Sequence, residues 1–204
     1  MAKHVTLIDA GTGNIRSVHK ALESLGASVR LTDDPRQLLR SSRVILPGVG
    51  AFGEFMKRLQ ARGLQGAIQE FFQRGFPLLG ICVGMQALFE ASEEMGEHPG
   101  LGLLPGRVLR FPSIPDLKIP HTGWNELNPE KDSPLWQNLS PGDYAYFNHA
   151  YYCAAARPGN IVASTHYGIL FTSAVQHENL FGVQFHPEKS QRVGLKILAN
   201  FLNI

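Results

Sequence analysis

The stretch Gly80-Ile81-Cys82-Val83-Gly84 restricts the fold of this 204-residue chain more than any other. The apolar residues that lead into it suit one buried strand, and the segment 85–89 that follows suits a helix. A cysteine between two glycines at such a junction has the pattern of a nucleophile elbow, a tight turn whose small neighbours let the reactive side chain project from the sheet edge. A buried structural cysteine beside a tight turn is the alternative, and the pentapeptide alone does not decide between them.

The order of apolar runs predicts an α/β fold. Residues 1–90 alternate short apolar runs with segments of helical spacing, which is typical of a parallel sheet with helices on both faces. After residue 100 the pattern changes to short strands separated by turns, followed by a final amphipathic helix. The predicted strands of this second part are 107–111, 144–153, 161–165, 171–176 and 180–185, and the helix is 193–202. We expect one three-layer domain, residues 1–204, with a mostly parallel central sheet and an antiparallel extension.

The composition is that of an ordinary soluble globular protein, with 44% hydrophobic residues, 18% charged residues and a net charge of +2. Without a basic run or an arginine-rich stripe, the chain is not expected to bind nucleic acid. Asp9 interrupts the first apolar run before a signal-peptide core forms, and no later run approaches membrane-spanning length. We therefore expect a cytoplasmic protein. Two cysteines, Cys82 and Cys153, are too few for a disulfide framework, so Cys82 is free to react in a reducing compartment.

Two glycine-rich loops follow predicted strands. Pro47-Gly48-Val49-Gly50 comes directly after the strand 43–46, where sharp turning can present backbone N–H groups to a ligand or an oxyanion. A simple strand-to-helix connection is the alternative. Gly11-Thr12-Gly13-Asn14 invites a dinucleotide-binding interpretation, but the third glycine of that fingerprint would fall at Arg16, which argues against it.

His186-Pro187-Glu188 follows the last predicted strand. Side chains two residues apart in an extended segment point the same way, so His186 can act as a base for Cys82 while Glu188 orients the imidazole. A zinc deaminase also carries His-x-Glu, but it needs a Pro-Cys-x-x-Cys segment that this chain lacks, so no metal is expected. The sequence leaves His121 and His149 undecided. Cys153 is interpreted as a structural residue. The remaining histidines are interpreted in the same way: His4, His19, His98, His166 and His177.

Three motifs together resemble the class I glutamine amidotransferases: the loop 47–50, the segment 80–86 and the His-Pro-Glu motif. Within that class, the chain is similar to the glutaminase subunits of imidazole glycerol phosphate synthases of histidine biosynthesis. That similarity extends over nearly the whole chain and is carried by four further segments, 9–14, 120–125, 146–152 and 182–190.

The resemblance implies a chemical role for each motif. Cys82 attacks the side-chain amide of glutamine and forms a glutamyl thioester while ammonia leaves, with His186 as proton shuttle and Glu188 as its partner. Water then frees glutamate. Backbone N–H groups of Val83 and of the Val49-Gly50 region stabilise the tetrahedral oxyanion. This chemistry needs no metal or organic cofactor.

The resemblance also implies that Gln86 and Glu94 hold glutamine, with Glu94 facing its α-ammonium group. A solvated acidic helix is the alternative for Glu94, because acidic residues surround it at Glu90, Glu93 and Glu97.

The family further implies a partner, a (βα)8-barrel cyclase subunit that receives ammonia through a channel and makes imidazole glycerol phosphate and aminoimidazole carboxamide ribonucleotide. Trp124, Tyr146 and Lys189 match the contacts that face this partner, although core aromatics are equally consistent with the first two. Two positions depart from the family's usual residues: Asn148 stands where the family usually has valine, and Ala150 where it usually has serine or threonine. The family's hydroxyl group is therefore missing at Ala150. A glutaminase subunit for another amination, and a non-catalytic scaffold for a synthase, are the alternative functions.

Overall fold

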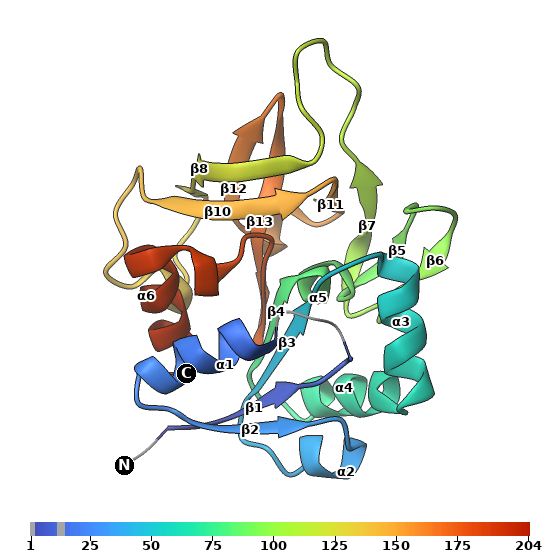
Figure 1. Ribbon diagram of the computed structural model, residues 1–204, viewed down its shortest axis with the longest axis vertical. Helices are drawn as coiled ribbons and strands as arrows, with labels where there is room; N and C mark the ends of the chain where they lie inside the picture. Colours follow the sequence, from blue (N-terminus) through green and yellow to red (C-terminus); the bar gives the residue numbers. More distant parts are fainter. Residues whose placement is uncertain (1–2, 12–14) are drawn as a thin grey trace.

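The computed structural model describes residues 3–11 and 15–204, and it shows a sheet that runs through the whole molecule (Figure 1). Thr12, Gly13 and Asn14, which belong to the loop weighed above for dinucleotide binding, lie outside the described residues. In the described part of the chain, a twelve-stranded sheet has the main order β2-β1-β3-β4-β14-β13-β11-β7-β5-β6. The predicted mixed α/β fold is confirmed.

The first five strands in that order are parallel and form the lower part of Figure 1. They are β1 (His4–Ile8), β2 (Ser28–Thr32), β3 (Val44–Gly48), β4 (Leu78–Cys82) and β14 (Leu180–Val183). β3 and β4 are buried at every position, as expected for strands covered on both faces. Their carboxyl ends meet at one edge of the sheet.

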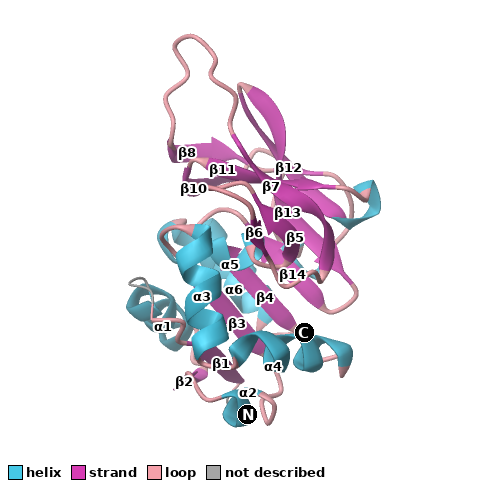
Figure 2. Ribbon diagram, turned by 90° about the vertical axis from the view of Figure 1, so that its right-hand side faces the viewer, coloured by secondary structure: helices cyan, strands magenta, loops and turns pink. Residues whose placement is uncertain are grey.

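Helices cover both faces of this parallel part (Figure 2). They are α1 (Ile15–Ser24), α2 (Pro35–Leu38), α3 (Phe52–Ala61), α4 (Leu64–Gln73), α5 (Val83–Gln86) and α6 (Gln191–Phe201). The chain moves from β1 to β2 in one direction along the sheet and from β3 to β4 in the other, so right-handed crossovers place α1 opposite α3 and α4. Gly63, at φ 68°, makes the predicted break between α3 and α4.

The second part of the chain builds the predicted antiparallel extension. Its strands in the main sheet are β5 (Phe89–Ser92), β6 (His98–Pro99), β7 (Leu104–Arg110), β9 (Asn128–Pro129), β11 (Tyr151–Ala155), β12 (Ile161–Tyr167) and β13 (Ile169–His177). A separate antiparallel pair, β8 (His121–Glu126) and β10 (Tyr144–His149), lies over the carboxyl ends of the parallel strands.

Two local predictions were wrong. The helix expected at 85–89 ends at Gln86, because the carbonyl groups of Ala87 and Leu88 accept hydrogen bonds from the segment 101–104 and the chain turns into β5. Pairing with a distant segment thus overrides the local helical spacing. The run 144–153 is two strands in two different sheets, since the chain leaves β10 at Ala150 to join the main sheet as β11.

One cluster of buried apolar side chains extends through both parts of the molecule. It includes Leu46 and Ile81 from the parallel strands as well as Phe147 and Phe171 from the antiparallel ones. Among the described residues, no helix has the length and apolar character needed to cross a membrane.

Candidate active site

Cys82 stands at the turn between β4 and α5 with φ 54° and ψ −113°, and its side chain is 3% exposed. A non-glycine residue at positive φ costs about 1–3 kcal/mol and is typical of functional turns. Glycine is needed on either side of Cys82, because any side chain there would clash with the backbone. A Cβ atom on Gly84 would lie 1.8 Å from the carbonyl oxygen of Leu46, and one on Gly80 would lie 2.6 Å from that of Gly84. The predicted elbow is therefore present, although only one helical turn follows it.

The strands beside β4 bring the other predicted groups to the cysteine. On one side, β3 pairs Gly48 with Cys82, so the Val49-Gly50 loop begins next to the sulfur. On the other side, β14 pairs Val183 with Ile81, and the chain then continues to His186. Parallel strands that end at one edge thus assemble the site from three distant segments.

His186 lies between the sulfur and a carboxylate. Its Nδ1 is 2.9 Å from Oε1 of Glu188, and its ring also hydrogen-bonds Cys82. Burial disfavours the charged imidazole, but the hydrogen bonds and charges of Cys82 and Glu188 outweigh it and raise the pKa of His186 to about 10. The His186 side chain is 4% exposed and that of Glu188 is 0% exposed. The site therefore favours a protonated His186 at neutral pH.

The backbone of His186 is tied to β10. Its N–H donates to the carbonyl of Tyr146 at 2.9 Å, and its own carbonyl accepts from the Ser190 hydroxyl at 2.7 Å. The same Ser190 oxygen accepts from the N–H of Tyr146 at 2.9 Å. Ser190, which is 1% exposed, therefore links the histidine to the two-stranded sheet.

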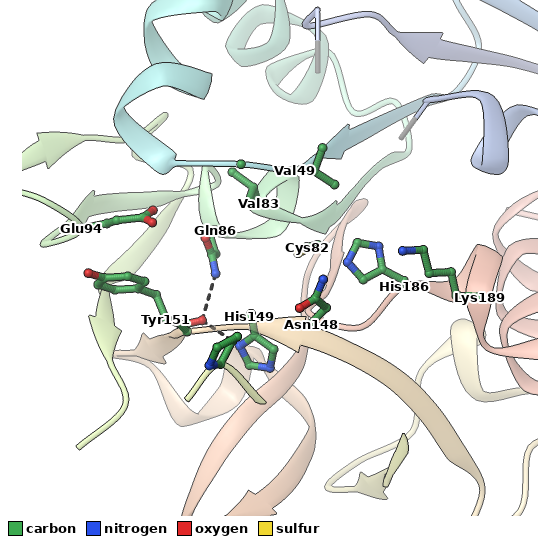
Figure 3. A pocket seen from close by; sticks show the side chains of 13 residues that line it. Val49, Cys82, Val83, Gln86, Glu94, Asn148, His149, Tyr151, His186 and Lys189 are labelled. Carbon is green, nitrogen blue, oxygen red and sulfur yellow. Dashed lines mark hydrogen bonds between the residues drawn. The ribbon is translucent and has the colours of Figure 1, made fainter. Parts of the chain in front are cut away.

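These groups open onto a pocket with a volume of about 340 Å³ (Figure 3). A small polar metabolite fits a site of this size. The lining residues come from both sheets and from the loops after β3 and β4: Val49, Gly50, Cys82, Val83, Gln86, Glu94, Pro120, Asn148, His149, Ala150, Tyr151, His186 and Lys189.

Gln86 and Glu94, predicted to hold a substrate, both line the pocket, and each also has a partner within the protein. Gln86 Nε2 donates to the Tyr151 carbonyl at 3.0 Å. Glu94 Oε2 accepts from the N–H of Phe52, the first residue of α3, at 2.7 Å. The solvated-helix alternative for Glu94 is wrong, because the preceding residues form β5 rather than a helix.

The three residues predicted to face a partner lie together at the outer side of the site. Tyr146 pairs with Trp124 across β10 and β8, with the two rings edge to face at 6.2 Å. Lys189 Nζ lies 5.6 Å from the centre of the Tyr146 ring, a cation–π contact. Trp124 is 46% exposed, and Tyr144 beside it is 50% exposed. Tyr146 is half-buried, and neither it nor Trp124 belongs to the hydrophobic core, so the aromatic residues form a partly exposed patch.

Comparison with known proteins identifies the family. Residues 6–204 match the family described as glutamine amidotransferase class-I. This chain belongs to the class I glutamine amidotransferases. The resemblance inferred from its motifs is confirmed.

Two relatives and one solved structure illustrate how far this amidotransferase resembles known members. Imidazole glycerol phosphate synthase subunit HisH of Salinibacter ruber is 49% identical, over 96% of this chain and 92% of the relative. The HisH subunit of Gloeobacter violaceus is 50% identical, over 98% of this chain and 88% of the relative. A crystal structure of a glutamine amidotransferase superposes with a TM-score of 0.76 at 20% identity, covering 98% and 99% of the two chains. That superposition supports the fold.

Sequence reasoning missed two buried polar residues of this amidotransferase site. Gln184 is 0% exposed and its Nε2 lies 3.7 Å from Cys82 Sγ, and Ser190 holds the His186 backbone. Both are two residues from the His-Pro-Glu motif, and for Gln184 the alternation of an extended segment was the available signal. The segment Pro187–Lys189 that precedes Ser190 is a 3-10 turn, so alternation gave no signal for Ser190. Cys153 is fully buried, and burial raises the pKa of its thiol. Among the described residues, no cluster of three or more histidine, cysteine or acidic side chains could hold a metal ion.

Proposed function

We propose that this amidotransferase is the glutaminase subunit of an imidazole glycerol phosphate synthase. It hydrolyses glutamine to glutamate and ammonia, and a cyclase subunit consumes the ammonia in histidine biosynthesis. The names and the high coverage of the relatives support the assignment to this synthase. The observation that carries the glutaminase chemistry is His186, which contacts both the Cys82 sulfur and the Glu188 carboxylate at the wall of one pocket.

In the proposed reaction, the Cys82 sulfur attacks the side-chain carbonyl carbon of glutamine and forms a carbon–sulfur bond. The protonated His186 gives its proton to the amide nitrogen, so the carbon–nitrogen bond breaks and ammonia leaves. Water then attacks the thioester while His186 takes a proton from it, and glutamate leaves as the sulfur is regenerated. Glu188 stabilises the charge on the imidazole throughout.

The surrounding groups have supporting roles in this proposal. Backbone N–H groups of Val83 and of the Val49-Gly50 loop stabilise the oxyanion, since both segments line the pocket beside the sulfur. The carboxylate of Glu94 attracts the α-ammonium group of glutamine, and Gln86 lines the same wall.

We also propose that the exposed patch around Trp124, Tyr146 and Lys189 binds a (βα)8-barrel cyclase. Exposed aromatic side chains at the rim of a pocket are typical of protein interfaces. The chain would act as a single domain, residues 1–204, because one sheet and one core connect its two parts. A cytoplasmic location would keep the Cys82 thiol reduced.

The test compares glutamine with ammonium salts as nitrogen source for the reconstituted complex. Cys82→Ala should abolish turnover with glutamine and leave turnover with ammonium intact, and the matched variant Cys153→Ala should retain both. Equal loss of both activities in Cys82→Ala would contradict a channelled glutaminase. Copurification with a different synthase would instead favour another amination, and full glutamine-dependent turnover in Cys82→Ala would favour the scaffold alternative.

A further inference from the structure

A buried side-chain amide holds the sulfur of Cys82 from the side opposite the Val49-Gly50 loop. Gln184 follows β14 directly, so the parallel register that pairs Val183 with Ile81 brings it next to Cys82. Its Nε2 lies 3.7 Å from Cys82 Sγ, and its Oε1 accepts from Gln86 Nε2 at 3.2 Å. Its backbone N–H donates to Ser173 on β13 at 2.9 Å, which fixes the main chain at this point.

The orientation of the Gln184 amide follows from these partners. Gln86 Nε2 is a donor only, so it must face the oxygen of the Gln184 amide and not its nitrogen. The NH₂ group of Gln184 is then directed at the sulfur. With the amide reversed, the oxygen would face the sulfur and the lone pairs would repel. Gln86 therefore decides which end of Gln184 meets Cys82.

Gln86 is held in turn by the carbonyl group of Tyr151. That oxygen accepts from Gln86 Nε2 at 3.0 Å, and Nδ1 of His149 lies 2.8 Å from it (Figure 3). His149 Nε2 lies 3.2 Å from Nδ1 of His121, whose Nε2 lies 3.2 Å from the side-chain nitrogen of Asn125. These contacts form one chain of hydrogen bonds from β8 to the sulfur.

The two histidines of this chain are neutral. Burial lowers the pKa of His121 to about 4 and that of His149 to about 3, so each ring carries a single N–H. The Asn125 nitrogen can only donate, which makes Nε2 of His121 an acceptor and places its hydrogen on Nδ1. His149 then accepts at Nε2 and donates from Nδ1 to the Tyr151 carbonyl. Each N–H group along the chain from Asn125 through His121 and His149 to the Tyr151 carbonyl therefore faces an acceptor.

We infer that Gln184 is a positioning residue that holds the Cys82 sulfur by donating a hydrogen bond from its amide. Gln86 and the carbonyl of Tyr151 keep the amide turned the right way, and the neutral pair His121 and His149 fixes that carbonyl. The inference rests on the proposed role of Cys82 as the nucleophile. It adds to the role expected for Gln86, which lines the pocket and whose amide nitrogen also orients Gln184.

The test uses variants that keep the length of the side chain. Gln184→Met removes the donor, and Gln184→Glu keeps an acceptor for Gln86 but places oxygen against the sulfur. The matched control is Gln176→Met on β13, whose side chain contacts Glu178 far from the pocket. Cys82 is alkylated with iodoacetamide as a function of pH, and the modified peptide is identified by mass spectrometry.

In Gln184→Met, the midpoint of the alkylation profile should move up by about one pH unit, and kcat with glutamine should fall by about 10- to 100-fold. Gln184→Glu should shift the midpoint further, and Gln86→Met should shift it less. In the Gln184 variants, KM and ammonium-dependent turnover should change little. The other groups near the sulfur that titrate or carry charge are unaltered in every variant: His186, Glu188, His149, Cys153, Glu94 and Lys189.

A wild-type alkylation profile in both Gln184 variants would overturn the inference, because a purely structural role changes the unfolding temperature without moving that profile. If Gln184→Met does not fold, the alkylation profile of Gln184→Glu alone tests the inference. The alkylation measurement uses the isolated chain and needs no turnover. A wild-type complex that releases no glutamate would therefore refute the proposed function while the role of Gln184 is still decided.

Discussion

Glu188→Gln tests the central arrangement of the site, since it removes one negative charge and keeps the shape of the side chain. The carboxylate lies 2.9 Å from His186 Nδ1. The Glu188 side chain is 0% exposed, so water cannot reach the site and compensate for the lost negative charge. A hydrogen bond to a charged group contributes about 1.5–3 kcal/mol, which corresponds to a loss of about 10- to 150-fold in glutamine-dependent kcat. Ammonium-dependent turnover should persist.

The pH dependence gives Glu188→Gln a second readout. The carboxylate is one of two groups that raise the pKa of His186, so the pKa of His186 should fall in the variant and the alkaline limb of the rate profile should move to lower pH. The folded-state pKa of about 10 lies above the ordinary histidine value of 6.5, so the charge on His186 stabilises the fold below pH 6.5. That contribution is lost as the pH rises through about 10.

The assay measures glutamate release by the reconstituted complex between about pH 6 and pH 10. Glu178→Gln is the matched control, because Glu178 is exposed in the turn between β13 and β14. Unchanged rates and an unchanged profile in Glu188→Gln would refute the role assigned to this carboxylate. Equal loss with glutamine and with ammonium would point to a damaged interface instead.

Three further perturbations test the elbow, the exposed patch and the buried histidines. Gly84→Ala places a Cβ atom 1.8 Å from a backbone oxygen and should lower the free energy of unfolding by about 2–4 kcal/mol, whereas Gly66→Ala, with open space, should not. Trp124→Ala should weaken cyclase binding by about 2 kcal/mol in a calorimetric titration without changing the unfolding temperature; unchanged affinity would exclude Trp124 from the interface. Burial lowers the pKa of His149 to about 3 from 6.5, so the unfolded chain binds a proton that the folded chain does not. This group should cost about 1.4 kcal/mol of stability per pH unit below about pH 6.5, and urea unfolding of His149→Gln should show a smaller slope.

The elbow and the His-Pro-Glu motif could be predicted because their signals are local. Glycines on both sides of Cys82 meet a steric need of the turn itself. His186 and Glu188 are close in the sequence, but the extended segment expected there was wrong: Pro187–Lys189 forms a 3-10 turn, and this turn brings the Glu188 carboxylate to His186 Nδ1. The helix expected after the elbow failed for the opposite reason. Its last turn is replaced by hydrogen bonds from the segment 101–104, which no local pattern reveals.

The sequence by itself determined the fold class, the family and the residues proposed for catalysis, since periodicity, glycine spacing and short motifs are properties of neighbouring residues. Only the tertiary structure decided how these residues are held. Gln184 meets Gln86 across 98 residues of chain and Cys82 across 102. The charge state of each histidine also depends on what surrounds it. His186 gains a proton beside Cys82 and Glu188, while burial keeps His149 neutral. Burial and hydrogen-bond partners exist only once the segments have met, and for that reason the orientation of the elbow's sulfur was decided by the fold.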